Sequence, residues 1–248
     1  MSGAVPAVTA GQMREVDRLA VETYGIALLQ MMENAGRALA ELARRIVGGT
    51  VPDRRFLVAA GKGNNGGGGL NAGRHLANWG AQVAAFLEGP DALEDVTAHQ
   101  CRAAGAAGVS MVGGPAAIEA VHPGAADLAL DALIGYGLKG APRAWTGEMI
   151  TRLNESGIPV LALDVPSGLD ATSGECPGPC IRAAATLTLA LPKTGLLTPG
   201  GRAVAGRLYL ADIGIPPTLY RRLGLAVGSL FAQETLVSLD AGRVDRWP

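Results

Sequence analysis

Residues 59–80 read AAGKGNNGGGGLNAGRHLANWG. The apolar run RFLVAA at 55–60 leads into this stretch and is typical of a buried strand, and NAGRHLANWG at 71–80 has the spacing of a helix. Between them, every residue from Gly61 to Gly69 except Lys62 is glycine or asparagine. Two interpretations follow: a tight strand-to-helix turn without room for side chains, or a backbone that approaches a phosphate-bearing ligand.

The rest of the chain alternates between strand-like and helix-like segments. Thr9 and Gln12 form a capping-box pattern before the first of two helices that precede residue 55. Further helices are expected at 93–106, 115–121 and 146–156, and further strands at 81–88, 109–112, 127–135, 159–166, 185–192 and 207–214. Nearly continuous Val, Ala and Leu in these strands predict a mostly parallel sheet sandwiched by helices, in a single Rossmann-like α/β domain.

The two N-terminal helices are expected at 13–25 and 28–47, and the core of the domain at about 9–216. The tail at 217–248 is too short for a second domain. It contains a short strand-like stretch, a turn and a closing proline within ETLVSLDAGRVDRWP. We expect its apolar residues to pack on the domain or on a dimer mate; they are Leu223, Leu225, Val227, Leu230 and Phe231.

Composition excludes several classes of protein. Hydrophobic residues make up 48% of the chain and charged residues 17%, which is typical of a globular protein and not of a disordered one. The formal net charge of -1 gives no positive electrostatic potential that would attract nucleic acid or an acidic membrane surface. The sequence contains neither an apolar run long enough to span a membrane nor a signal peptide, so we expect a cytoplasmic protein. Three cysteines and three histidines lack the spacing of zinc ligands.

Polar residues stand at the carboxyl ends of the predicted strands. Asp131 lies in or near the end of one strand, Asp164 ends another before Pro-Ser-Gly, and Lys193 follows a third. Ligands of open α/β sheets bind beyond these strand ends. The sequence therefore predicts a cleft lined by carboxylates, amides, one lysine and bare backbone.

A dinucleotide-dependent dehydrogenase is an alternative interpretation of the glycine-rich stretch. Gly61, Gly63 and Gly66 match the pattern G-x-G-x-x-G between a strand and a helix, and Glu88 ends the next strand, where a ribose-binding carboxylate is expected. The match leaves Asn64 and Asn65 unexplained, and a chain with 36 glycines produces such a pattern easily.

The strand-end motifs together resemble a known family. GKGNNGGGGL, DALIGYGLKG, DVPSGLD and LPKTG, in this order, look like the NAD(P)H-hydrate epimerases, the YjeF N-terminal domain family; LLQMMENAG upstream and LADIGIP downstream fit as well. The resemblance implies a Rossmann-like homodimer that interconverts the R and S forms of NADHX and NADPHX at C6, with a potassium ion (K⁺) in the site. It also implies a dehydratase that consumes the S form. We expect that dehydratase to be a separate protein.

The resemblance assigns roles to particular residues. It implies substrate-binding positions at Asn64, Asn65, Gly66, Gly67, Gly68, Gly135, Tyr136, Gly137, Leu138, Lys139, Gly140, Ala141 and Asp164. It implies K⁺ ligands at Asn65, Asp131 and Ser167. Amide, carboxylate and hydroxyl oxygens suit a hard cation.

One position departs from the family pattern. The family reads Gly-Gly-Asp-Gly where this chain has Gly68 in place of the aspartate. Loss of this carboxylate opens the alternative of a catalytically impaired nucleotide-binding scaffold. The presence of the other motif residues, including Asp131 and Asp164, favours a working or altered site over an inactive one.

The chemistry of the implied substrate selects catalytic candidates. The ring nitrogen of NADHX can expel the C6 hydroxyl, and water can return to either face of the planar cation. Such a reaction needs a group that protonates the departing hydroxyl and activates the returning water, near a carboxylate that tolerates the cation. Asp164 is the candidate for this acid/base role, with Lys193 as a second polar group.

Overall fold

The computed structural model describes residues 5–89, 93, 95–240 and 243–245. Within them a nine-stranded sheet has the order β3-β2-β1-β4-β5-β6-β7-β8-β9. The strands are β1 (Arg55–Ala60), β2 (Gln82–Leu87), β3 (Ser110–Gly113), β4 (Leu128–Ala132), β5 (Val160–Leu163), β6 (Ala185–Leu189), β7 (Arg207–Ala211), β8 (Leu236–Asp240) and β9 (Arg243–Asp245). β1 to β7 pair in parallel, and β8 and β9 are antiparallel additions. This confirms the predicted mostly parallel α/β sheet.

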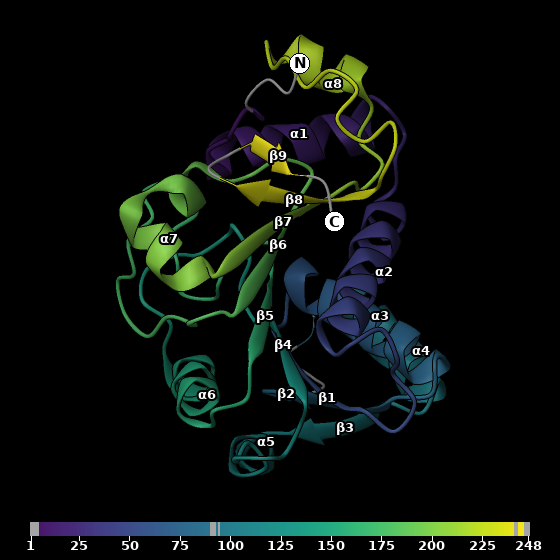
Figure 1. Cartoon of the computed structure of the whole chain (residues 1–248), viewed down its shortest axis with the longest axis vertical. Helices are drawn as coiled ribbons and strands as arrows, with labels where there is room; N and C mark the ends of the chain where they lie inside the picture. The colour runs from purple at the N-terminus through teal and green to yellow at the C-terminus, as the bar shows by residue number, and fades with distance from the viewer. Residues whose placement is uncertain (1–4, 90–92, 94, 241–242, 246–248) are drawn as a thin grey trace.

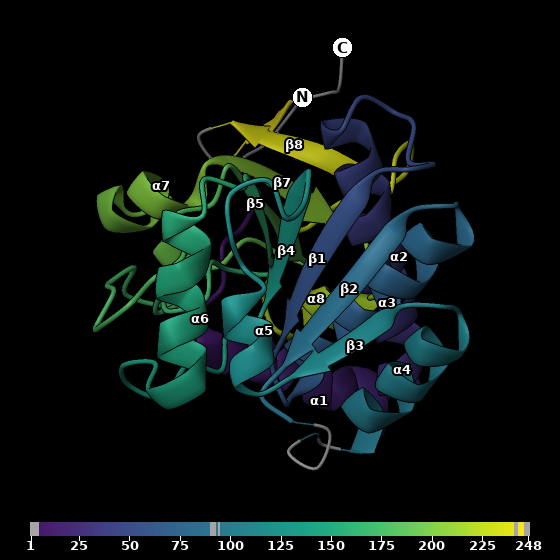
Figure 2. The same cartoon turned by 90° about the horizontal axis from the view of Figure 1, so that it is seen from below.

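Helices cover both faces of the sheet (Figure 1). α2 (Leu28–Ile46), α3 (Asn64–Asn78) and α4 (Asp95–Ala106) lie on one face, and α5 (Pro115–Glu119), α6 (Ala144–Glu155) and α7 (Pro199–Ala205) lie on the other (Figures 1 and 2). α1 (Ala10–Glu22) and α8 (Pro217–Arg222) lie near the β7–β8 end of the sheet. A 3₁₀ turn at Thr194–Leu197 follows β6.

The pleat of β1 shows how this sandwich is held together. Phe56, Val58 and Ala60 pack into the core cluster that contains residues of α2 and α3. Leu57 and Ala59 point the other way, into the cluster that contains residues of α5 and α6. All five side chains are almost completely buried, since both faces of a parallel strand are covered. This explains why RFLVAA is apolar without alternation.

The predicted capping box at the start of α1 is confirmed. The Gln12 backbone N–H donates to Thr9 Oγ1 at 3.2 Å, and the Thr9 N–H donates to Gln12 Oε1 at 2.9 Å. These bonds satisfy N–H groups that have no partner within the helix.

The third helix begins earlier than the sequence predicts. α3 starts at Asn64 instead of residue 71, so the glycine run forms its first turns. An ideal Cβ on Gly69 would come within 2.4 Å of the Cβ of Ala132 in β4, and one on Gly73 within 3.3 Å of Val58 in β1. The glycines thus allow the helix to lie unusually close to the sheet, and this packing outweighs their low helix propensity.

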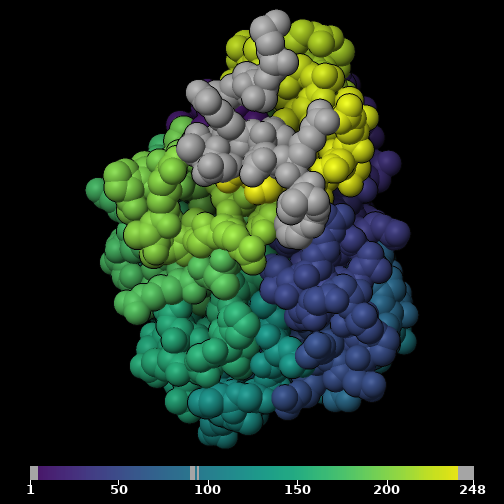
Figure 3. All heavy atoms as spheres, viewed as in Figure 1, coloured from purple at the N-terminus to yellow at the C-terminus, as the bar shows by residue number. Residues whose placement is uncertain are grey.

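The C-terminal tail continues the sheet. The predicted strand-like stretch is β8, which pairs with β7 in the register Leu208↔Leu239. The apolar tail residues pack as expected, on the cluster that contains Met13, Val16 and Leu19 of α1; they are Leu223, Leu225, Val227, Leu230 and Phe231. Figure 3 shows the C-terminal segment, in yellow, lying against the rest of the molecule. The predicted turn at 241–242 and the closing proline at 248 lie outside the described residues.

Among the residues that the structure describes, no helix is both long enough and apolar enough to cross a membrane.

Candidate functional site

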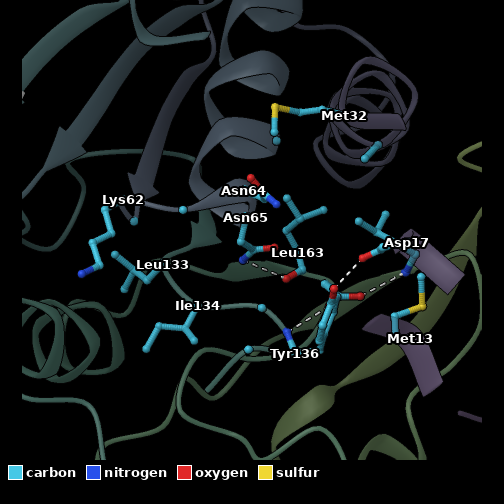
Figure 4. Close-up of a pocket in the computed structure, with 18 of the residues that line it drawn as sticks. Met13, Asp17, Met32, Lys62, Asn64, Asn65, Leu133, Ile134, Tyr136 and Leu163 are labelled. Carbon is cyan, nitrogen blue, oxygen red and sulfur yellow. Dashed lines mark hydrogen bonds between the residues drawn. The ribbon is translucent and has the colours of Figure 1, made fainter. Parts of the chain in front are cut away.

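A cavity of about 620 Å³ opens at the carboxyl ends of the central strands (Figure 4). The strand order reverses beside β1, whose neighbours are β2 and β4, and the loops after β1 and β4 both line the cavity. Such a switch point leaves a crevice between the two loops. Its apolar walls come from α1, α2 and the loop after β4; they include Met13, Leu28, Met31, Met32, Leu133 and Ile134.

A buried ion pair forms one end of this cavity. Asp164 follows β5 and Lys193 lies in the loop after β6, and their side chains are 4% and 1% exposed. Lys193 Nζ donates to Asp164 Oδ1 and, at 2.8 Å, to the carbonyl oxygen of Leu189. The charges compensate each other inside the protein, which makes the pair tolerable in a site with little water.

The backbone of Asp164 is held in the left-handed region, with φ of 71°. Non-glycine residues adopt this conformation at a cost unless the surrounding structure enforces it. Here the Asp164 N–H donates to the carbonyl of Leu187 at 2.7 Å, while the Tyr136 N–H donates to Asp164 Oδ2 at 3.2 Å. The carboxylate is therefore fixed toward the cavity by contacts on both sides.

Tyr136 joins the loop after β4 to helix α1. Its hydroxyl donates to Asp17 Oδ2 at 2.5 Å, and the Lys193 ammonium lies 6.0 Å from its ring centroid (Figure 4). Burial, followed by the neighbouring Asp17 carboxylate, raises the pKa of Tyr136. Burial also raises the pKa of Asp17, and the hydrogen bond from Tyr136 opposes this. Tyr136 therefore keeps its proton and remains a hydrogen-bond donor to Asp17.

A second polar cluster lies beneath the cavity. Asp131 and Ser167 are completely buried, and neither lines the cavity. Ser167 donates to the Asp131 carboxylate from Oγ at 2.6 Å and from its N–H at 2.8 Å, and the Ile134 N–H donates to Ser167 Oγ at 2.8 Å. Burial raises the pKa of Asp131 to about 6, opposed by the hydrogen bonds from Ser167. No Lys, Arg or His forms an ion pair with Asp131 in the described part of the chain.

Asn65, at the start of α3, lines the cavity. Its Nδ2 donates to the carbonyl of Leu163 at 3.3 Å. Its Oδ1 faces Gly135, because an ideal Cβ there would lie 3.1 Å from Asn65 Oδ1 and 3.4 Å from Asp164 Oδ2. Gly135 follows Ile134, whose backbone contacts Ser167. The amide oxygen of Asn65 and the hydroxyl of Ser167 therefore face two consecutive residues of the same loop.

The structure brings most of the expected site residues to one cavity. Those that line it are Asn64, Asn65, Gly68, Gly135, Tyr136, Gly137, Lys139, Asp164 and Lys193. The expected substrate-binding residues that do not line it are Gly66, Gly67, Leu138, Gly140 and Ala141.

Gly66 and Gly67 allow close packing of the surrounding protein atoms. A Cβ on Gly61 would lie 1.9 Å from the carbonyl oxygen of Leu133, and one on Gly66 would lie 1.9 Å from the carbonyl oxygen of Gly61. A Cβ on Gly67 would lie 2.7 Å from the sulfur of Met32. The side chains are missing because protein atoms occupy the space. The lack of room for side chains thus accounts for the glycines at these positions, of which Gly66 and Gly67 lie in the first turns of α3, and the two asparagines face the cavity.

Sequence reasoning missed the contribution of α1. Met13, Arg14 and Asp17 line the cavity, and Asp17 contacts Tyr136 across 119 residues of sequence. Trp145, at the start of α6, is a further lining residue. Acidic residues on an amphipathic helix are expected on its solvated face, and Asp17 is one of three in α1. No local pattern therefore marks Asp17 as functional.

Comparisons with known proteins identify the family of this chain. The family model described as YjeF-related protein N-terminus matches residues 28–195. The chain belongs to this family. The crystal structure of the yeast protein ynu0 superimposes with a TM-score of 0.82 at 22% identity, covering 95% of this chain and 100% of that one, which shows that the two chains share a fold.

Curated relatives fall into two groups by length. The NAD(P)H-hydrate epimerase of Dehalogenimonas lykanthroporepellens is 50% identical and is covered over 87% of its length by 90% of this chain. The NAD(P)H-hydrate epimerase of Truepera radiovictrix is 40% identical, with 94% of its length and 88% of this chain covered. The bifunctional NAD(P)H-hydrate repair enzyme Nnr of Moorella thermoacetica is 41% identical over 86% of this chain, which spans only 41% of that longer protein.

Proposed function

We propose that this protein is an NAD(P)H-hydrate epimerase, an isomerase that interconverts the R and S forms of the hydrated nicotinamide cofactor. Family membership and the relatives named for this activity support the proposal. The observation that carries it is the buried Asp164–Lys193 pair facing a cavity at the switch point of the sheet. Neither the inactive scaffold nor the dehydrogenase is favoured by the relatives, since those at 50% and 40% identity are named epimerases.

The pair supplies what the reaction needs. One exchangeable proton lies between Lys193 Nζ and Asp164 Oδ1. Transfer of this proton to the C6 hydroxyl lets the hydroxyl leave as water, with the electron pair of the C–O bond, while the ring nitrogen donates its lone pair to C6. The Asp164 carboxylate stabilises the planar cation through its charge. Water then adds to either face and returns its proton to the pair, so that no proton is gained or lost.

The test is epimerisation of the pure R form of NADHX, read through a dehydratase that consumes only the S form. Asp164→Asn should abolish the conversion, because asparagine keeps the size of the side chain but neither takes up nor releases the proton. Asp53→Asn, at an exposed carboxylate outside the cavity whose backbone also lies in the left-handed region, is the matched control and should retain activity. Full activity of Asp164→Asn would contradict the proposed role, and no activity of the unaltered protein would contradict the proposed function.

The residues beneath the cavity fit the K⁺ that the family resemblance implies. Asp131, Ser167 and Asn65 offer carboxylate, hydroxyl and amide oxygens, a donor set for a hard cation. Asp131 is buried without a cationic side chain to pair with in the described residues, so a cation among these oxygens would offset the cost of its charge. We propose that these three residues hold K⁺, which would supply positive charge and fix the loop after β4.

If this assignment is correct, potassium should stabilise the protein. Replacing choline chloride by KCl at constant ionic strength should raise the melting temperature by about 2–4 °C for each kcal/mol of binding free energy. Asp131→Asn should abolish this shift, because the carboxylate supplies the charge that attracts the ion. Glu155→Gln, an exposed carboxylate of α6, is the control and should keep the shift. Equal shifts in both variants would rule out an ion at Asp131.

Gly68→Asp tests the departure from the family pattern. Gly68 lines the cavity, and a Cβ there would come within 2.9 Å of Leu163 Cδ2, the movable end of a side chain. We expect the aspartate to be accommodated by a rotation of Leu163 and to raise the rate of epimerisation several-fold, since a carboxylate at this position adds a polar contact for substrate or proton transfer.

Gly68→Asn separates charge from size in this experiment. The asparagine imposes the same steric demand on Leu163 without adding a carboxylate, so it should not raise the rate. Equal rates for Gly68→Asp and the unaltered protein, in variants of equal melting temperature, would mean that the carboxylate is dispensable in this chain.

The longer relatives suggest how the product of the proposed reaction is used. The bifunctional repair enzymes join a region similar to this chain to further sequence. We propose that this protein delivers the S form to a separate dehydratase and acts as a homodimer in the cytoplasm. Light scattering of the purified protein tests the dimer, and coupling to an added dehydratase tests the transfer.

A further inference from the structure

The cavity has a second end whose residues the proposed reaction does not use. Glu88 directly follows β2, whereas Asp164 directly follows β5, and both line the cavity. β1 and β4 lie between these strands in the sheet, so three strand spacings, about 14 Å, separate the two strand ends. The cavity is therefore long enough to present different groups to the two ends of an extended ligand.

The Glu88 carboxylate is available to a ligand. The residue is exposed, and its side chain forms no hydrogen bond or ion pair within the described residues. Its backbone is fixed, since the carbonyl of Glu88 accepts the N–H of Gly114 at 3.1 Å. A carboxylate on a fixed backbone at the cavity edge can accept hydrogen bonds from hydroxyl groups without first breaking bonds of its own.

Trp145 lies beside the same loop. Its Nε1 donates to the carbonyl of Gly114 at 3.0 Å, so one glycine holds both the indole ring and the backbone of Glu88. Trp145 is half-buried and lines the cavity. An indole ring whose N–H is already bonded presents an apolar surface, which suits the flat face of a purine base.

The backbone between the two ends suits a pyrophosphate. α3 begins at Asn64, directly after β1, and the first N–H groups of a helix favour negative charge. Asn64 and Lys62 line the cavity at this point, and Figure 4 shows Lys62 on the far side of it from Asp17 and Tyr136. Pyrophosphate is common to NADHX and NADPHX, so these groups attract both without distinguishing them.

We propose that Glu88 accepts hydrogen bonds from the hydroxyls of the adenosine ribose, with the adenine against Trp145, and thereby makes the site select NADHX over NADPHX. The inference rests on the proposed function and names the preferred substrate of the same site. A free 2′-hydroxyl donates to the carboxylate, whereas a 2′-phosphate adds about two negative charges beside it. Lys139, the remaining lysine of the cavity wall, belongs to the loop after β4.

Substrate preference gives the first test. We measure kcat/KM for the R forms of NADHX and NADPHX with the unaltered protein, Glu88→Gln, Glu88→Arg and the control Glu148→Gln, an exposed carboxylate of α6 outside the cavity. The unaltered protein and the control should prefer NADHX by about tenfold or more, from the repulsion of two charges at an exposed site. Glu88→Gln should bring the two values close together, and Glu88→Arg should reverse the preference. An unchanged ratio in both Glu88 variants would overturn the proposal.

Binding without turnover separates this inference from the proposed function. ADP-ribose and its 2′-phosphorylated analogue carry the adenosine end without a hydrated nicotinamide ring, and calorimetry gives their Kd values directly. In the unaltered protein the Kd of ADP-ribose should be lower than that of the analogue by about tenfold or more. Glu88→Gln should remove this difference in Kd. Discrimination in a protein that shows no epimerase activity would retain the role of Glu88 and reject the proposed reaction. Equal Kd values in an active epimerase would reject the role of Glu88 alone.

Discussion

Replacing Lys193 by methionine is expected to lower the free energy of unfolding by about 3–5 kcal/mol and to abolish epimerisation. The ammonium is 1% exposed, and it provides the salt bridge to the Asp164 carboxylate, which is itself only 4% exposed. Methionine fills a similar volume but leaves the carboxylate with two N–H donors, from Tyr136 and Leu189. A buried charge with so little compensation is costly.

A double-mutant cycle distinguishes the charge from the packing. Asp164→Asn alone should also destabilise strongly, because it leaves the Lys193 ammonium buried without a counter-charge, and asparagine tolerates the left-handed backbone at this position. The double variant should be more stable than either single variant, because no charge is left unpaired. Urea unfolding gives the four free energies.

The surface pair of Arg18 and Glu22 is the control for this cycle. Both side chains are about half exposed, so Arg18→Met should leave stability essentially unchanged. Additive effects of the two core substitutions would show that Asp164 and Lys193 do not depend on each other in the folded protein.

Gly61→Ala and Gly66→Ala are expected to destabilise the fold by about 3 kcal/mol or more, at the upper end of the range for overpacking. In each case the new Cβ would lie 1.9 Å from a backbone carbonyl oxygen. Such an atom cannot rotate away like the end of a side chain, so the backbone itself would have to move: the loops after β1 and β4 apart for Gly61→Ala, and α3 away from residue 61 for Gly66→Ala.

Gly105→Ala, in α4, provides a matched comparison for these substitutions. Its Cβ would meet only Met111 Cε at 3.9 Å, so alanine should raise stability by about 0.5–1 kcal/mol through its better helix propensity. Thermal and urea unfolding measure all three variants. Small effects at Gly61 and Gly66, comparable to that at Gly105, would mean that the helix is seated less tightly than the structure indicates.

Local chemistry predicted much of this fold. RFLVAA at 55–60 forms β1 with the predicted bounds, because an apolar run of this length fits a strand that is covered on both faces. The same logic placed Asp164 and Lys193 at strand ends, and parallel strands then bring their side chains to one edge of the sheet.

The start of α3 could not be predicted in the same way. Helix propensity argues against a helix with four consecutive glycines, and only the neighbouring Gly61, Met32 and Ala132 show why glycine is needed there. The hydrogen bond between Asp17 and Tyr136 depends on how α1 docks, which is set by contacts between segments far apart in the sequence. The register of the tail strand β8 on β7 likewise depends on the tertiary fold.

The close seating of α3 on the sheet has a consequence for motion. Because the first turn of α3 packs at Gly66 against the backbone of Gly61, and Gly61 packs against the backbone of Leu133 just after β4, this part of the cavity is held by close backbone contacts. The loop of Tyr136 on the opposite wall is held as well, by hydrogen bonds to Asp17, Asp164 and Ser167. The start of α3 and the loop of Tyr136 are therefore already ordered before a ligand binds. Much of the conformational entropy of these residues has already been lost on folding, so binding does not have to remove it again.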